Sequence, residues 1–331
     1  MEKVTAVVVT YNRQALLCEC INALRSQTRK PDTILVVNNG STDNTEEWLK
    51  SQTDIVFITQ KNIGSGGGFS TGISEAFKAG ATWVWCMDDD GYPKEDALQL
   101  LLEASDEELL LRNCAVIDKQ DKKSFVWKTQ QYSNLDEVDC KLIHGIGHPF
   151  NGTLLHRKVI ERVGVPQARF FLWGDETEYY YRIVKKNRIP VCTVAASIHY
   201  HPRSAFSYKA DWDYASGWKM YYYIRNRYHI HTAKFNNKII AWVNYTCFLM
   251  AFAGIVMVYQ KTDKLKKLGF IMWPAADALT KNFNADLPFV LSKLKKPGRP
   301  ALNSVNSYIK ARWAALSGLF LTPRPGAAAN A

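Results

Sequence analysis

Four short apolar runs alternate with segments of helical character, and this alternation constrains the fold more than any other feature of the sequence. The runs are rich in β-branched residues and lie at residues 5–12, 32–39, 55–60 and 82–87. Segments with helical periodicity or N-cap residues separate them, at residues 15–27, 41–52 and 67–80. Strands buried on both faces have such continuous apolar runs. The sequence therefore predicts an α/β fold: a Rossmann-like, mixed and mainly parallel sheet with helices on both faces.

The character of the sequence changes near residue 205, where long helical segments rich in aromatic residues begin. We therefore predict a nucleotide-binding and catalytic domain at residues 1–205 and a helical region at 206–320. Residues 321–331, a stretch of Pro, Gly and Ala, are expected to form a flexible tail. Within the first domain, residues 152–164 and 176–188 have the pattern of amphipathic helices.

The charge of the chain indicates an anionic partner. Lys and Arg outnumber Asp and Glu by 42 to 31, a net charge of +11, which suits nucleic acid, an anionic membrane or a phosphorylated substrate. No zinc-finger spacing or arginine-rich arm is present, and much of the excess lies late in the chain beside apolar stretches. These features favour a membrane surface over nucleic acid.

The cysteines and the N-terminus favour a cytoplasmic protein. Seven scattered cysteines, without CxxC spacing, are typical of reduced core thiols. The first residues have no basic segment before a long apolar stretch, so they predict a first strand and no secretory signal.

Polar residues follow the predicted strands at the edge where α/β sheets bind ligands. They are Tyr11 and Asn12, Asn38 to Ser41, and Asp88 to Gly91. In an extended chain Asp88 and Asp90 project the same way, so the pair can hold Mg²⁺ or Mn²⁺ and, through it, a diphosphate. Asp89 points the other way, toward a sugar hydroxyl or a backbone donor. The alternative is a solvated acidic turn in which Gly91 has a positive φ.

A glycine-rich segment, "KNIGSGGGFSTGI" at residues 61–73, opens the third predicted helix. Such a segment lets the backbone approach a ligand, or it is a flexible turn. It matches neither a Walker A loop nor GxGxxG, which argues against a P-loop ATPase and a dinucleotide-dependent dehydrogenase.

Two further groups carry candidate chemistry. In "FFLWGDETEYYYRI", residues 170–183, acidic side chains open a helix, where one can act as a general base or simply stabilise the helix N-terminus. In "SIHYHPR", His199 and His201 share one face of a strand, and either can complete a metal shell.

An ordered set of motifs resembles an inverting family 2 glycosyltransferase of the GT-A fold over about residues 3 to 230. The motifs are "VVVTYNR", "VVNNGSTDNT", "NIGSGGGFSTGI", "MDDDG", "NGTLLHRKVIERVG" and "FFLWGDETEYYYRI". The "GGGF", the triple aspartate and the tryptophan before "GDE" are most similar to bacterial galactofuranosyltransferases, with rhamnosyltransferases next.

The resemblance implies roles for particular residues. It implies a catalytic base at Asp175, with Glu176 as the alternative. It implies metal binding by Asp88, Asp90 and His199, with His201 as the competing histidine. Binding of the donor, the uridine pocket included, would fall on Thr10, Tyr11, Asn12, Asn39, Ser41, Asn62, Gly66, Gly67, Asp88, Asp89 and Trp173. Trp173 could also stack on an acceptor sugar, or it is a buried aromatic. Many family members have an aspartate where this chain has Asn38 and Asn39, which leaves the choice between uridine and thymidine open.

The implied activity is transfer of galactofuranose from UDP-galactofuranose to a hydroxyl of a growing, lipid-linked glycan, with Mn²⁺ or Mg²⁺ as cofactor. The alternatives are a rhamnosyltransferase that uses dTDP-rhamnose and a non-catalytic glycan-binding or scaffolding subunit. Homo-oligomers are compatible with the sequence.

An uncharged apolar run of 22 residues lies between Lys238 and Lys261. Its length just suffices to span a bilayer, but three polar residues interrupt it and its aromatic residues are spread along it. We expect a helix at the cytoplasmic membrane surface, with Lys264, Lys266 and Lys267 facing anionic lipid. A dimer interface, a buried helix and a transmembrane anchor are the alternatives.

Overall fold

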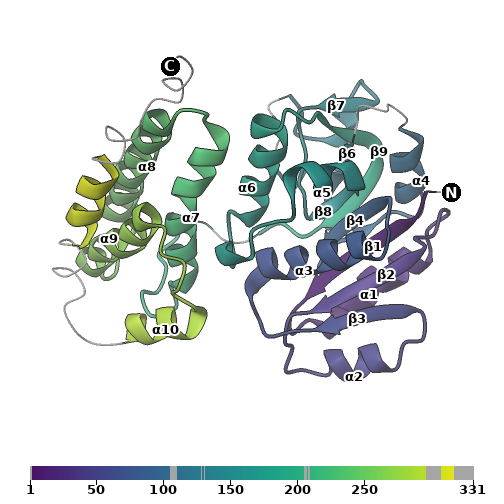
Figure 1. The fold of residues 1–331 in the computed structure, drawn as a ribbon, viewed down its shortest axis with the longest axis horizontal. Coiled ribbons are helices and arrows are strands. Elements are labelled where there is room, and N and C mark those ends of the chain that lie inside the picture. Colours follow the sequence, from purple (N-terminus) through teal and green to yellow (C-terminus); the bar gives the residue numbers. More distant parts are fainter. Residues whose placement is uncertain are drawn as a thin grey trace, which may run out of the picture. The chain divides into compact units, whose positions relative to one another are not determined.

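The structure is a computed structural model that describes residues 2–104, 110–127, 129, 131–204, 207, 209–295 and 307–316. The chain divides into two compact units, Met1–Ala205 and Phe206–Ala331. Figure 1 shows the α/β unit and the helical unit. The predicted tail at residues 321–331 lies outside the described residues.

The N-terminal unit is built on a nine-stranded sheet with the order β3-β2-β1-β4-β8-β6-β9-β5, and β7 pairs with β9. The strands are β1 (Val4–Thr10), β2 (Thr33–Asn38), β3 (Ile55–Thr59), β4 (Trp83–Asp88), β5 (Tyr92–Pro93), β6 (Leu111–Asp118), β7 (Leu142–His144), β8 (Asn151–His156) and β9 (Val191–His201). The first four strands are mutually parallel, and β6 is parallel to β9. The predicted mixed, mainly parallel sheet is confirmed.

Helices cover both faces of this sheet. They are α1 (Gln14–Arg25), α2 (Thr45–Lys50), α3 (Gly64–Lys78), α4 (Ala97–Glu103), α5 (Arg157–Val163) and α6 (Asp175–Tyr181). A π-helical turn, Arg182–Lys186, continues α6. The helix expected over residues 152–164 is confirmed only for its second half, which forms α5. Residues up to His156 instead form β8, which pairs with β4 and β6. Sheet pairing overrides the helical pattern there.

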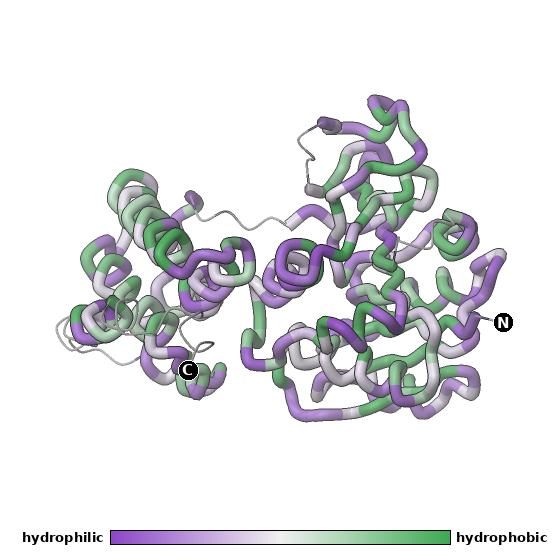
Figure 2. Tube along the Cα trace, turned by 45° about the horizontal axis from the view of Figure 1, so that its top comes forward, coloured by the Kyte–Doolittle hydropathy of each residue, from purple (hydrophilic) through white to green (hydrophobic). Residues whose placement is uncertain are grey.

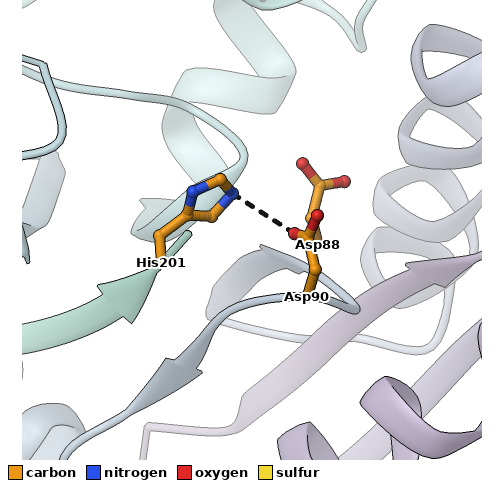
Figure 3. A group of neighbouring side chains, drawn as sticks. All are labelled: Asp88, Asp90 and His201. Atoms are coloured by element: carbon orange, nitrogen blue, oxygen red, sulfur yellow. Dashed lines mark ion pairs between the residues drawn. The ribbon is translucent and has the colours of Figure 1, made fainter. Parts of the chain in front are cut away.

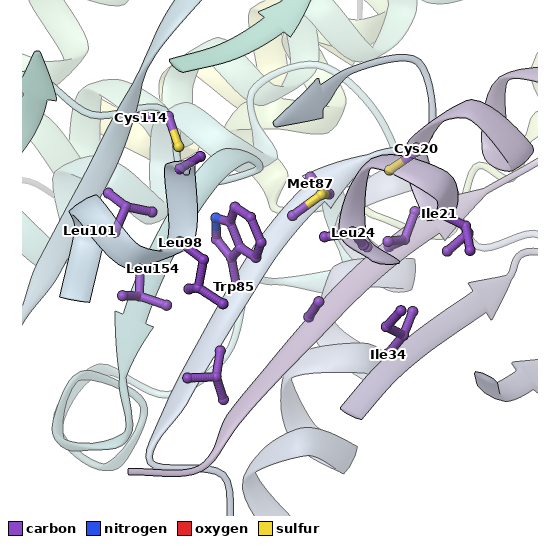
Figure 4. Packing of buried hydrophobic residues seen from close by; sticks show 14 of the residues in the cluster. Cys20, Ile21, Leu24, Ile34, Trp85, Met87, Leu98, Leu101, Cys114 and Leu154 are labelled. Carbon is purple, nitrogen blue, oxygen red and sulfur yellow. The ribbon is translucent and has the colours of Figure 1, made fainter. Parts of the chain in front are cut away.

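Alternate residues of β1 enter two separate cores. Val4, Ala6 and Val8 pack with α1, α2 and α4, whereas Val7 and Val9 pack with α3, α5 and α6. Figure 4 shows part of the first core around the buried Trp85. Because both faces of the central strands are buried, polar side chains of these strands gather at their ends.

The C-terminal unit is helical. It contains α7 (Trp218–Lys234), α8 (Lys238–Tyr259), α9 (Lys264–Thr280) and α10 (Leu287–Lys295), and residues 307–316 are also helical. Helix α8 is the one described helix long and apolar enough to cross a membrane, and 28% of its most apolar window is buried. Length and composition alone do not separate such a helix from a core helix.

Candidate active site

The acidic turn follows β4 at the carboxyl edge of the parallel strands. Asp88 is the last residue of β4 and is half-buried, whereas Asp89 is only 3% exposed. Burial, followed by repulsion from Asp90 and Asp89, raises the pKa of Asp88 well above its usual range. A divalent cation bound here would offset this concentration of negative charge.

The register of two antiparallel strands brings a histidine to the acidic turn. Tyr92 of β5 pairs with Tyr200 of β9, so the residues just before β5 lie beside the end of β9. His201 Nε2 is 3.2 Å from Asp90 Oδ1. One ligand atom from each of Asp88, Asp90 and His201 lies within 4.8 Å of the other two, and Figure 3 shows the three side chains converging. This spacing suits one small cation.

His201, and not His199, therefore completes the group. His199 pairs with Pro93, further along β5, and is fully buried. Burial lowers its pKa to about 3. A Cβ on Gly91 would lie 2.3 Å from His199 Nε2, so Gly91 makes room for the ring. Gly91 is not among the glycines with positive φ, and the turn does not need a glycine for that reason.

Arg13 is a site residue that the sequence analysis missed. Its Nη1 donates to Asp89 Oδ1 at 3.1 Å and to Asp90 Oδ2 at 2.8 Å. Asp89 also accepts a hydrogen bond of 2.7 Å from Thr10 Oγ1, so it is held by the protein. Arg13 directly follows the strand-end residues Tyr11 and Asn12 in the sequence, and this position was the available signal.

The acidic residues at the start of α6 lie near this turn. The charges of Glu176 and Asp175 both help to raise the pKa of Asp88. Asp175 is 3% exposed and accepts a hydrogen bond of 2.6 Å from Ser65 Oγ. Half-buried Glu176 accepts from Asn151 Nδ2 at 3.2 Å. Burial, and then the charge of Asp175, raises its pKa to about 7. Either carboxylate has the surroundings of a general base.

The loop before α6 has an unusual backbone. Phe171, Trp173 and Gly174 have φ values of 65°, 54° and 111°, and such strain in non-glycine residues is often found at functional sites. A Cβ on Gly64 would lie 1.9 Å from the carbonyl oxygen of Phe171. Trp173 is half-buried.

The glycines of α3 are used for packing. A Cβ on Gly66 would lie 3.0 Å from the Cβ of Asp175, and one on Gly67 would lie 2.4 Å from the side chain of Ile63. Both glycines are buried. They let the start of α3 pack against its neighbours, including the start of α6, and so help to position Asp175. Asn62 accepts a hydrogen bond of 2.9 Å from the Gly64 amide at the same end.

Most of the predicted pocket residues that follow β1 and β2 form hydrogen bonds with other groups of the protein. Asn39 is buried, donates to the Gly64 carbonyl at 2.9 Å and accepts from Gln60 at 2.9 Å. Ser41 Oγ accepts from the Asn12 amide at 2.9 Å. Tyr11, by contrast, is 43% exposed. Tyr11 therefore has exposed ring surface that a ligand could cover.

Three comparisons with known proteins bear on the family and the fold of this chain. The family model described as "Glycosyl transferase family 2" matches residues 5–164. Galactofuranosyltransferase GlfT1 of Mycolicibacterium smegmatis is 31% identical over 223 residues, which are 63% of this chain and 74% of the relative. GlfT1 of Mycobacterium tuberculosis is 31% identical over 222 residues, 63% of this chain and 73% of the relative.

A solved structure supports the fold. Residues 1–349 of TarS from S. aureus match with a TM-score of 0.52 at 13% identity, over 96% of this chain and 92% of that chain. At this identity the match concerns the fold alone. The sequence relatives decide the family: this chain is a glycosyltransferase of family 2.

Proposed function

We propose that the protein transfers galactofuranose from UDP-galactofuranose to a hydroxyl of a growing, lipid-linked cell-surface glycan, with inversion at the anomeric carbon. The sugar follows the names of the relatives that are 31% identical, and the acceptor class follows the motif resemblance alone. The reaction would take place at the cytoplasmic face of the cell membrane.

The observation that carries the proposed chemistry is the convergence of Asp88, Asp90 and His201 near the acidic start of α6. Two carboxylates and an imidazole suit Mn²⁺, and the carboxylates also suit Mg²⁺. Such an ion would stabilise the charge of the departing diphosphate. Arg13, held between Asp89 and Asp90, would keep the turn in shape and add positive charge beside the phosphates.

In the proposed reaction the acceptor oxygen forms a bond to the anomeric carbon while the bond from that carbon to the diphosphate breaks. A carboxylate at the start of α6 takes the acceptor proton. We assign this role to Asp175, with Glu176 as the alternative. Inversion needs a single in-line displacement and no covalent enzyme intermediate. Tyr11, whose ring is exposed, would cover the nucleobase.

A donor screen tests this function. Purified protein is incubated with Mn²⁺ or Mg²⁺, a lipid-linked acceptor series and either UDP-galactofuranose or dTDP-rhamnose, and the products are read by mass spectrometry. The proposal predicts acceptor-dependent release of UDP and gain of one hexose. Transfer only from dTDP-rhamnose would overturn the assignment of the donor, and no transfer from either donor would overturn the proposed function and favour a non-catalytic subunit.

A further inference from the structure

Helix α8 exposes one long apolar face. The residues that point into the helical unit are Ala241, Tyr245, Leu249, Phe252 and Val256. Exposed apolar residues recur every three or four positions on the opposite side: Ile240, Val243, Cys247, Met250, Gly254, Met257 and Val258. We call these seven residues the α8 face. At 100° per residue they occupy an arc of about 100°.

The α8 face is unusual in its exposure as well as its extent. Met250 is 63% exposed and Val258 is 72% exposed. The helix has 22 residues, so the face extends over most of its length of about 33 Å. It contains no charged residue. Figure 2 colours residues by hydropathy, and α8 is hydrophobic along most of its length. A continuous apolar surface of this size indicates a binding partner.

The rest of α8 is held by its own unit, which argues against a helix that crosses a bilayer alone. Tyr245 donates to the carbonyl oxygen of Ile224 in α7 at 3.1 Å. Arg312, in the helical segment 307–316, donates to Thr246 Oγ1 at 2.9 Å and lies 4.2 Å from the centre of the Trp242 ring. A spanning orientation would take this arginine into hydrocarbon. The α8 face therefore contacts its partner along the side of the helix, with the helix axis parallel to the partner's surface.

The net charge of the helical unit favours an anionic membrane over a second copy of this chain as the partner of the α8 face. Residues 206–331 contain 18 Lys or Arg and five Asp, a net charge of +13, whereas residues 1–205 contain 24 and 26, a net charge of −2. The whole positive excess of the protein is therefore in the unit that exposes the α8 face. Two copies joined through this face would bring two strongly positive surfaces together, which is unfavourable. An anionic bilayer offers both an apolar interior and complementary charge.

Lysines flank the α8 face at both ends. Lys238 begins α8, and Lys261 and Lys264 follow its last turn, all three in exposed or half-buried positions. Leu265, next to Lys264, is 82% exposed. The sequence analysis predicted that Lys267 faces lipid, and this prediction is wrong. Lys267 is fully buried and its Nζ lies 2.8 Å from Asp211 Oδ1, so it is not part of the membrane contact.

We propose that the α8 face lies in the plane of an anionic membrane, with its apolar side chains at the boundary between headgroups and acyl chains and its flanking lysines among the phosphates. The segment 307–316, which contacts α8 through Arg312, extends the apolar contact. It exposes Ile309 and Trp313 by 58% and 75%. This binding concerns the lipid surface and does not depend on which sugar is transferred.

The test is flotation of the full-length protein with vesicles of phosphatidylcholine, with or without phosphatidylglycerol, in the absence of donor and acceptor. The wild type should bind the anionic vesicles, more weakly as salt rises, and bind the neutral ones less. Met250→Glu should lower the vesicle partition coefficient about tenfold or more, because an apolar side chain that the bilayer would bury is replaced by a charge. Met250→Leu should bind like the wild type.

Val56→Glu is the matched control, because Val56 is 55% exposed on β3 of the other unit and the change of net charge is the same. It should bind vesicles like the wild type. Circular dichroism and thermal unfolding check that each variant is folded. Absence of wild-type binding to anionic vesicles, or equal loss in Val56→Glu and Met250→Glu, would overturn the proposal. So would a stable dimer in light scattering that Met250→Glu dissociates while vesicle binding is unchanged.

Discussion

The two units of this protein differ in which side chains they bury and which they expose. In the N-terminal unit the apolar residues are buried on both faces of the sheet, and charged groups converge at the ends of the strands. In the C-terminal unit charged and polar groups such as Lys267 and Arg225 are buried, while a row of apolar side chains on α8 is exposed. The first arrangement is typical of a site for a small polar ligand, and the second of a large apolar surface. Substitutions in the two units distinguish these two kinds of site.

The largest effect is expected from the carboxylates of α6. Asp175→Asn should lower turnover about 10²- to 10⁴-fold, because a general base is removed, and should leave donor binding and vesicle binding unchanged. Steady-state release of nucleotide measures it. Glu176→Gln should have the smaller effect. The reverse order would transfer the base role to Glu176, and full activity of both variants would exclude the α6 acids from the chemistry.

The metal group is expected to come next. Asp88→Asn should lower turnover about 10²- to 10³-fold and weaken binding of UDP in the presence of Mn²⁺, as read by calorimetry. Asp54→Asn is a control of equal charge, since Asp54 is exposed and pairs with Arg25. Unchanged metal dependence in Asp88→Asn would contradict the site.

The histidines give a sharper form of the same test. His201→Ala should reduce the affinity for Mn²⁺ at the site by about 10- to 100-fold, because His201 lies beside Asp90. Titration of the metal, followed by electron paramagnetic resonance of free Mn²⁺, measures this affinity. A lower thermal stability with normal affinity for Mn²⁺ would show that the ring has a packing role only.

The pH dependence of stability is expected to be smaller. Glu176 has a folded-state pKa of about 7, above its ordinary value of 4.5, so the folded protein keeps a proton that the unfolded chain has released. This contribution is therefore fully favourable below pH about 4.5 and is lost as the pH rises toward about 7. Denaturant unfolding of wild type and Glu176→Gln across this range measures it. The variant should lose less stability over the range, and identical pH profiles would contradict the assignment.

Two glycine substitutions give the smallest effects, with opposite signs in the two units. Gly91→Ala should cost about 1–3 kcal/mol, because its Cβ would meet His199. Gly254→Ala should stabilise α8 by about 0.5–1 kcal/mol, because among the described residues no atom beyond the adjoining helix backbone lies within 4 Å of the added Cβ and glycine weakens a helix interior. Thermal unfolding of both variants measures these changes. A stable Gly91→Ala protein would mean that His199 moves freely.

The position of the site was predictable, but parts of its composition were not. The acidic turn was found because an apolar run ends in three aspartates, and the carboxyl ends of parallel strands share one edge. Which histidine lies beside Asp90 depended on the pairing of Tyr92 with Tyr200, which joins segments far apart in the sequence. Arg13 was missed for a similar reason, because its partners Asp89 and Asp90 lie far along the chain.

The sequence by itself determined the α/β class of the first unit, the edge of the sheet that carries the acidic residues and the apolar character of residues 239–260. Those properties are local, since a strand, a helix and a strand end are each specified by a few neighbouring residues. Only the tertiary structure decided that Lys267 is buried and that Met250 is exposed. A helix that is apolar on all sides contains no signal for which side faces its neighbours, so packing against α7 and α9 had to make that choice.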